Sequence, residues 1–180
     1  MGRLGFSYIG AVWLAMLLVP NLLWARHMPQ GCTAQGENRA LVLLERLGQA
    51  AVTCCALVFT DFNLRPWSPW SLWLAASLLL MLLYELWWIR YFRSPRRLED
   101  LYDSSLLGIP VPGAVLPVAA FLLLGIYGRV LWMLLAAALL GAGHIGVHWG
   151  HRQTLRAHKN TPAITGPERL SKAGDRAAGI

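Results

Sequence analysis

The stretch 71–92 reads SLWLAASLLLMLLYELWWIRYF, and Glu85 and Arg90 are its only charged residues. A hydrophobic segment of about 18 or more residues with few charges is long enough to cross the ~30 Å hydrocarbon core of a bilayer. Inside that core there is no water to bond the backbone, so a spanning segment satisfies its own hydrogen bonds as a helix or within a closed barrel. The stretch therefore predicts a transmembrane helix.

The rest of the chain repeats this pattern. Hydrophobic residues make up 56% of the 180 residues and charged residues 14%, whereas about 25% are charged in an ordinary soluble domain. No ten-residue segments alternate in the manner of barrel strands. The sequence predicts an all-α integral membrane bundle of five helices within 1–151 and, beyond any short continuation of the last helix, a basic, flexible tail at 152–180. Besides 71–92, the predicted spans are 6–24, 39–60, 109–127 and 130–149.

The basic residues predict the orientation of this bundle. Five spans place the termini on opposite sides, and cytosolic loops carry an excess of Lys and Arg. Twelve such residues lie on the side of loop 25–38 with Arg39 at the start of the next span, of loop 90–108 and of the tail, against three on the other side. The N-terminus is therefore expected outside and the C-terminus in the cytosol, in a cell membrane of the bacterial inner-membrane type.

The net charge of +7 also bears on partners. Basic cytosolic loops attract anionic lipid headgroups, which accounts for the charge without a nucleic acid. No groove-reading motif and no aromatic platform for single strands stands in a polar segment. The bilayer, with its anionic headgroups, is the expected partner, and a nucleic-acid role is excluded.

Polar residues inside the predicted spans share one depth. With a rise of ~1.5 Å per residue, all five helices place their unusual residues in the cytosolic half of the membrane. Ionisable groups there are costly and usually face a bundle interior or a water-filled cavity. We therefore expect a polar, ligand-binding pocket that opens to the cytosol. Its predicted residues are Asn21, Glu45, Gln49, Tyr84, Glu85, His144 and His148, with Arg46 and Arg90 beside them.

A purely structural network is the alternative to this pocket. In that case Glu45 pairs with Arg90, or Glu85 with Arg46, and the pairs fix the packing of the helices. Long Arg side chains near helix ends also extend to the headgroups. The residue types and depths favour neither interpretation over the other.

Residues 143–151, GHIGVHWGH, raise the question of a metal. His144 and His148 are four residues apart and share one helix face. With Glu45 and Glu85 they would supply two imidazoles and two carboxylates, a set that suits zinc or non-haem iron. The glycines would also let a flat haem approach the backbone. Glycines at this spacing, however, more often serve close helix packing in membranes, so metal or haem is the less favoured interpretation.

The connector 93–107 has two interpretations of its own. Leu98, Leu101 and Leu106 indicate a short amphipathic helix at the interface, with those leucines in lipid and the neighbouring arginines at headgroups. Such a helix would cover the cytosolic pocket. An ordinary charged connector fits the same residues equally well.

The function expected from these features is the binding or transport of a small or amphipathic ligand. Glu45 and Glu85 would act as protonatable or cation-binding groups, and Pro117 would make span 109–127 the moving part because proline removes a helix hydrogen bond. Five helices are few for an autonomous transporter, so an oligomer or a membrane partner is expected. A metal-dependent membrane enzyme and an accessory subunit that packs through the glycines of 130–149 are the alternatives.

Overall fold

The computed structural model describes residues 2–28 and 38–160, and its long elements are all helices, which confirms the all-α prediction. Two 3₁₀ turns, Thr60–Phe62 and Pro69–Ser71, lie in one loop. The strands β1 (Ser105–Leu106) and β2 (Ile109–Pro110) form a short antiparallel pair. The helices are α1 (Tyr8–Arg26), α2 (Arg39–Val58), α3 (Leu72–Arg93), α4 (Leu98–Tyr102), α5 (Pro112–Gly128) and α6 (Leu131–Asn160).

Four of these helices are long and apolar enough to cross a membrane: α1, α2, α3 with the turn before it, and α6. The remaining apolar helix, α5, has 17 residues, which span about 26 Å at the α-helical rise. It is also the most enclosed helix, since most of its side chains are buried and it packs against both α3 and α6. The predicted span 109–127 is thus present as a shorter, central helix.

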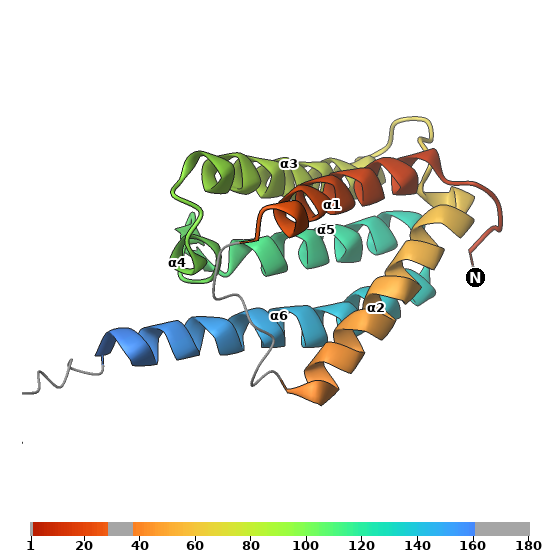
Figure 1. Ribbon diagram of the computed structural model, residues 1–180. Coiled ribbons are helices and arrows are strands. Elements are labelled where there is room, and N and C mark those ends of the chain that lie inside the picture. The colour runs from red at the N-terminus through yellow and green to blue at the C-terminus, as the bar shows by residue number, and fades with distance from the viewer. Residues whose placement is uncertain (1, 29–37, 161–180) are drawn as a thin grey trace, which may run out of the picture.

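The helices form one bundle with one oblique member. Figure 1 shows α1, α3, α5 and α6 running side by side, while α2 crosses at an angle and rests mainly on α6. The chain enters α1 at one end of the bundle, and α4 lies at the opposite end, beside the extension of α6. We refer to these, after the predicted orientation, as the outer end and the inner end of the bundle.

Glycines allow α2 to lie directly on α6. A Cβ atom added at Gly143 would come within 2.7 Å of the Glu45 Cα and of the Leu41 carbonyl oxygen, and one at Gly48 would lie 2.9 Å from the Leu140 Cβ. Both helices therefore need glycine at their crossing, as in other close helix contacts in membranes. The face of α6 that carries Gly143 is occupied by α2 of the same chain, which leaves that position no room for a flat cofactor or for a separate subunit.

A buried polar chain joins three helices in the middle of the bundle. Trp13 Nε1 of α1 donates to Ser77 Oγ of α3 (2.8 Å), and Ser77 Oγ donates to the Ala120 carbonyl oxygen of α5 (2.7 Å). Ser77 is fully buried. The hydroxyl thus connects α1, α3 and α5 through a single side chain.

We expect Ser77→Ala to lower the free energy of unfolding by about 1–2 kcal/mol, because it leaves the buried Trp13 indole N–H without an acceptor. Thermal or denaturant unfolding of the purified protein in detergent measures the change. Ser105→Ala, at an exposed residue, is the matched control and should have little effect. Equal stability of the two variants would contradict the role given to the Ser77 hydroxyl.

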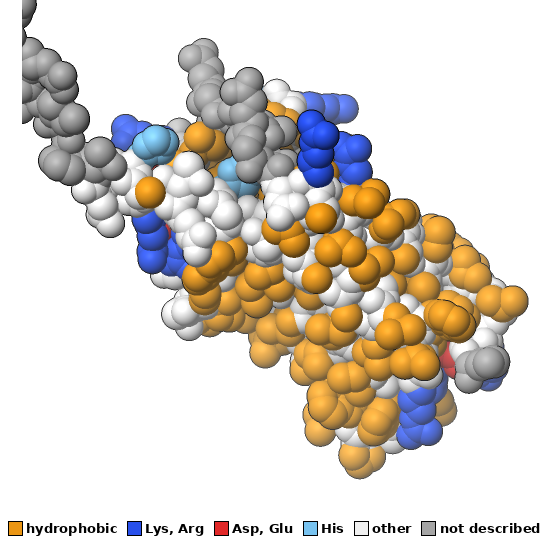
Figure 2. Space-filling model, turned by 90° about the horizontal axis from the view of Figure 1, so that it is seen from below, with side chains coloured by type: hydrophobic (Ala, Val, Ile, Leu, Met, Phe, Trp, Pro, Cys, Tyr) orange, Lys and Arg blue, Asp and Glu red, His pale blue; other side chains and the backbone are white. Residues whose placement is uncertain are grey.

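The surface of the bundle is apolar around its middle. Large side chains such as Leu43 and Leu47 of α2 and Leu79 and Leu86 of α3 are more than half exposed. Figure 2 shows hydrophobic side chains covering the middle of one face, with Lys and Arg gathered toward its two ends. Soluble monomers rarely expose so large an apolar patch, and this distribution is that of a membrane protein.

The helix α6 continues to Asn160, beyond the boundary predicted at residue 151. The reason is a long-range contact with the connector after α4. Asp103, in the connector after α4, binds Arg152, Arg156 and Lys159, which lie on one face of the extended helix. The part of the predicted flexible tail at 161–180 lies outside the described residues.

Candidate functional site

Two of the predicted residues meet between α1 and α3. Asn21 Nδ2 donates to the Tyr84 hydroxyl oxygen (2.8 Å) and to the Leu17 carbonyl oxygen one turn earlier (2.7 Å). Tyr84 is almost completely buried, and a buried tyrosine hydroxyl normally requires such a partner. Asn21 therefore fixes the polar end of Tyr84 within the inner half of the bundle.

A second predicted pair joins α2 to α6. The imidazole Nδ1 of His144 donates to Glu45 Oε1 in a short hydrogen bond of 2.6 Å. Both side chains are partly exposed, 20% for His144 and 28% for Glu45. The pair forms next to Gly143, whose missing side chain lets the backbone of α2 come close. The glycine contact and the pair thus define one point of the helix crossing.

The histidine face of α6 is covered by α4. The ring of His148 lies 4.5 Å from that of His144 and 5.1 Å from that of Tyr102, and Tyr102 also stacks on His151 at 4.6 Å. Leu101 and Tyr102 of α4 are both buried. The connector does form a short helix over the predicted pocket, but Leu101 packs into the bundle, whereas the sequence indicated a leucine in lipid.

These residues line a small, partly open cavity. It measures about 30 Å³, and a buried water requires about 10–15 Å³ by this measure, so there is room for about two waters. Within the described residues, neither Trp24 Nε1 nor His148 Nδ1, which belong to residues of its wall, has a hydrogen-bond partner. The space accommodates water but no organic ligand. Its wall includes Asn21, Trp24, Tyr102, Gly113, His144 and His148.

A larger, open groove lies on the other side of the Glu45–His144 pair. It has a volume of about 560 Å³ and is lined by Val42, Glu45, Arg46, Gln49 and Ala50 of α2. The amide Nε2 of Gln49 is buried and has no partner within the described residues. Glu45 lines this groove and binds His144, which lines the cavity. The pair therefore connects the groove to the water-sized cavity.

Three predicted residues line neither space: Tyr84, which Asn21 holds, Glu85 and Arg90. Glu85 is half-buried on α3, and its Oε1 is buried without a partner among the described residues. Arg90 donates from Nη1 to the Ser105 carbonyl oxygen (3.1 Å) and so holds the connector. The structural pairs considered from sequence are therefore replaced: Glu45 binds His144, and Arg90 binds backbone.

The predicted metal set is not assembled. Among the described residues, no group of three or more His, Cys, Asp and Glu side chains is placed to hold a metal ion. The Nδ1 of His144 is already bonded to Glu45, and Glu85 is absent from the wall that carries the histidines. The geometry thus offers a hydrogen-bonded carboxylate–imidazole pair in place of a four-ligand centre.

The ion cluster around Asp103 was missed from sequence. Asp103 accepts from Arg156 Nε (2.7 Å), Lys159 Nζ (3.2 Å) and Arg152 Nε (3.4 Å). The hydrogen bond from Arg156 is the largest cause that holds the pKa of Asp103 below its usual value; burial opposes it, and the hydrogen bond from Lys159 and the charges of both cations add to the lowering. The 152, 156, 159 spacing of basic residues was the available signal, since these positions share one face of a helix.

Comparisons with protein families, curated proteins and solved structures find no match to this chain. No residue role is therefore transferred from a relative.

Proposed function

We propose that the chain is a five-span protein of the cell membrane, with the N-terminus outside and the C-terminus in the cytosol. The arginines and lysines at the inner end, among them Arg93, Arg97 and Arg156, support this orientation through the positive-inside rule. The short α5 fits as the fifth span because its neighbours α3 and α6 enclose it, so its own length does not have to match the lipid.

We further propose that the protein binds a small or amphipathic ligand in the α2 groove, from the cytosolic side. The observation that carries this proposal is the position of Glu45 between the open groove and the small, water-sized cavity. Glu45 offers a negative group and Arg46 a positive one, while Val42 and Ala50 are apolar. A zwitterionic headgroup with an apolar chain matches this combination.

Ligand binding in the groove would change the inner cavity through His144. A ligand ammonium group that bonds to Glu45 competes with the imidazole N–H for the same carboxylate oxygen. His144 released from Glu45 can instead bond to water in the cavity, next to His148 and Tyr102. Groove and cavity are therefore coupled through one hydrogen bond, the arrangement expected of a proton-linked binding or transport site. A transporter of this size would function as an oligomer or with a membrane partner.

Glu45→Gln tests the site with lysophosphatidylethanolamine as the probe, because it combines an ammonium group, a phosphate and one acyl chain. We expect about tenfold weaker binding, the loss of one charge-assisted contact, measured by native mass spectrometry of the protein in lipid nanodiscs. Glu85→Gln makes the same chemical change at the same depth but outside the groove, and should leave binding unchanged.

Two results would contradict the proposed site. One is unchanged binding in Glu45→Gln at unchanged thermal stability. The other is an equal loss in both variants, which would mean that the negative charge acts at a distance and not through the groove.

A further inference from the structure

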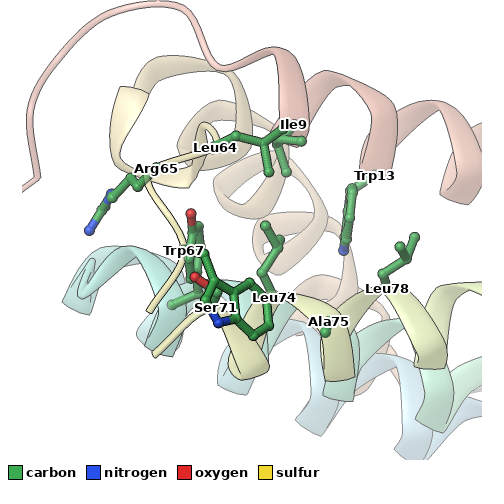
Figure 3. A pocket seen from close by; sticks show the side chains of 10 residues that line it. Ile9, Trp13, Leu64, Arg65, Trp67, Ser71, Leu74, Ala75 and Leu78 are labelled. Carbon is green, nitrogen blue, oxygen red and sulfur yellow. The ribbon is translucent and has the colours of Figure 1, made fainter. Parts of the chain in front are cut away.

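A second pocket lies at the outer end of the bundle, away from the Glu45–His144 pair. It has a volume of about 390 Å³ and opens between α1, α3 and the loop that joins α2 to α3. Figure 3 shows Trp13 reaching from α1 toward α3, with Leu74, Ala75 and Leu78 opposite and Leu64 and Ile9 near the loop. The pocket has the size of ordinary small-molecule sites, which measure about 300–1,000 Å³.

The walls of this pocket are fixed by hydrogen bonds. Trp13 is held through its indole N–H by Ser77. The loop is held by Asn63, whose Oδ1 accepts from the backbone N–H of Tyr8 (3.0 Å) and whose carbonyl oxygen accepts from the Tyr127 hydroxyl (3.2 Å). The space is therefore built into the fold, and a ligand that fills it loses little energy to rearrangement.

The chemistry of the pocket is that of an acyl chain site. Its lining is almost entirely apolar, and an apolar space does not hold ordered water. Leu78 and Ala75 at its edge are exposed on the side of α3, so a chain can enter sideways from the surrounding medium. Trp67 of the loop is 75% exposed, as expected of an aromatic residue at a membrane interface.

Positively charged residues outnumber negatively charged ones around the mouth of this pocket. Arg65 lines the pocket, and its side chain is 34% exposed while it pairs with Asp61 at 3.6 Å and lies over the Tyr127 ring. The described segments of the outer end, 2–8, 58–72 and 127–131, hold three arginines, Arg3, Arg65 and Arg129, against the one carboxylate of Asp61. The surplus favours an anionic headgroup over a zwitterionic one.

We propose that this pocket binds one acyl chain of an anionic phospholipid from the outer half of the membrane, with the lipid phosphate at Arg65. The site is distinct from the α2 groove, and the inference rests only on the membrane orientation of the proposed function. Trp13, Leu74 and Leu78 contact the chain, and Arg65 provides the charge that selects the headgroup.

The test uses the full chain in nanodiscs that contain phosphatidylglycerol with a photoreactive diazirine in one acyl chain. Peptide mass spectrometry then locates the crosslinks. We expect them to concentrate in segments 9–13 and 64–78. Crosslinks spread evenly over the exposed apolar residues of α2 and α6 would overturn the proposal.

Two test variants, each with a control, distinguish the contribution of the acyl chain from that of the lipid headgroup. Ala75→Phe fills the pocket and should abolish the local crosslinks, whereas Ala138→Phe, at an exposed residue of α6, should not. Arg65→Gln should reduce them about fivefold, the effect of one basic residue at an anionic surface, and Arg65→Lys should restore them.

Further controls test the role of the Arg65 charge, the selection of an anionic headgroup and the independence of this site from the α2 groove. Arg129→Gln removes a cation that stacks on Trp70 outside the pocket, and an effect as large as that of Arg65→Gln would overturn the role of Arg65. Equal crosslinking by phosphatidylcholine with the same diazirine chain would overturn the selection of an anionic lipid. Glu45→Gln should leave these crosslinks unchanged, so the outcome is independent of the cytosolic groove.

Discussion

Gly143→Ala is expected to destabilise the protein by about 3 kcal/mol, the upper part of the range for overpacking a close contact. The added methyl group would lie within 2.7 Å of the Glu45 Cα and of the Leu41 carbonyl oxygen. Both are backbone atoms of α2, which cannot move without shifting the helix. Inside a helix, alanine normally stabilises the folded state by about 1 kcal/mol relative to glycine. The cost of the clash therefore has to exceed this amount before the variant is less stable than the parent.

Gly150→Ala is the matched control for this variant. It lies on the same helix two turns later, and a Cβ atom there has nothing within 4 Å. It should be neutral or stabilising by up to ~1 kcal/mol. Unfolding of the two variants in detergent gives the comparison, and equal stabilities would contradict the close crossing of α2 and α6.

The same substitution bears on the site. Because Glu45 is the residue that Gly143 contacts, moving α2 outward lengthens the 2.6 Å hydrogen bond to His144. The histidine chemical shifts in an NMR spectrum would report this change. A Gly143→Ala variant that keeps the His144 shifts of the parent would show that the pair does not depend on the crossing.

The positions of the helices could be predicted from sequence because hydrophobic length is a local property. The stretch 39–60 corresponds to α2 and 71–92 to α3 within about two residues at each end. The continuation of α6 to Asn160 was not predictable in this way. It depends on Asp103, which lies about fifty residues away in sequence and has no pattern of its own.

Depth along a helix was predictable, but the direction of a side chain around it was not. The rise per residue is fixed, so Glu45 and His144 were correctly placed at one level, where they bond. Glu85 has the same depth as Tyr84, yet consecutive residues point about 100° apart on a helix. Tyr84 therefore faces Asn21 of α1, while Glu85 lies off the cavity wall.

Asp103→Asn is expected to release the last turns of α6. Arg152 is 7% exposed and relies on the Asp103 carboxylate, as do Arg156 and Lys159. Removing the carboxylate leaves three neighbouring cations, one of them buried. Because a buried charge without a partner is costly, we expect the free energy of unfolding to fall by about 2 kcal/mol after solvent screening. Hydrogen exchange of the backbone amides at 152–160 should become faster, while exchange in α3 and α5 stays the same. Glu99→Gln, which removes a different carboxylate, in the first turn of α4, is the control.

The dependence on pH follows from the lowered pKa of Asp103. A carboxyl group that is more acidic in the folded state stabilises that state fully above its unfolded pKa, about 3.9 for aspartate, and loses the contribution as the pH falls through the folded pKa. In the parent protein the protection of 152–160 should therefore decrease on acidification below about pH 4. Charge changes at other groups occur in both proteins, so the difference between parent and Asp103→Asn isolates the carboxylate. A difference that is already lost between pH 7 and 5 would contradict the role of the Asp103 carboxylate. A parent helix end that stays protected at pH 3 would show that packing of Tyr102 on His151 holds α6 without the ion cluster.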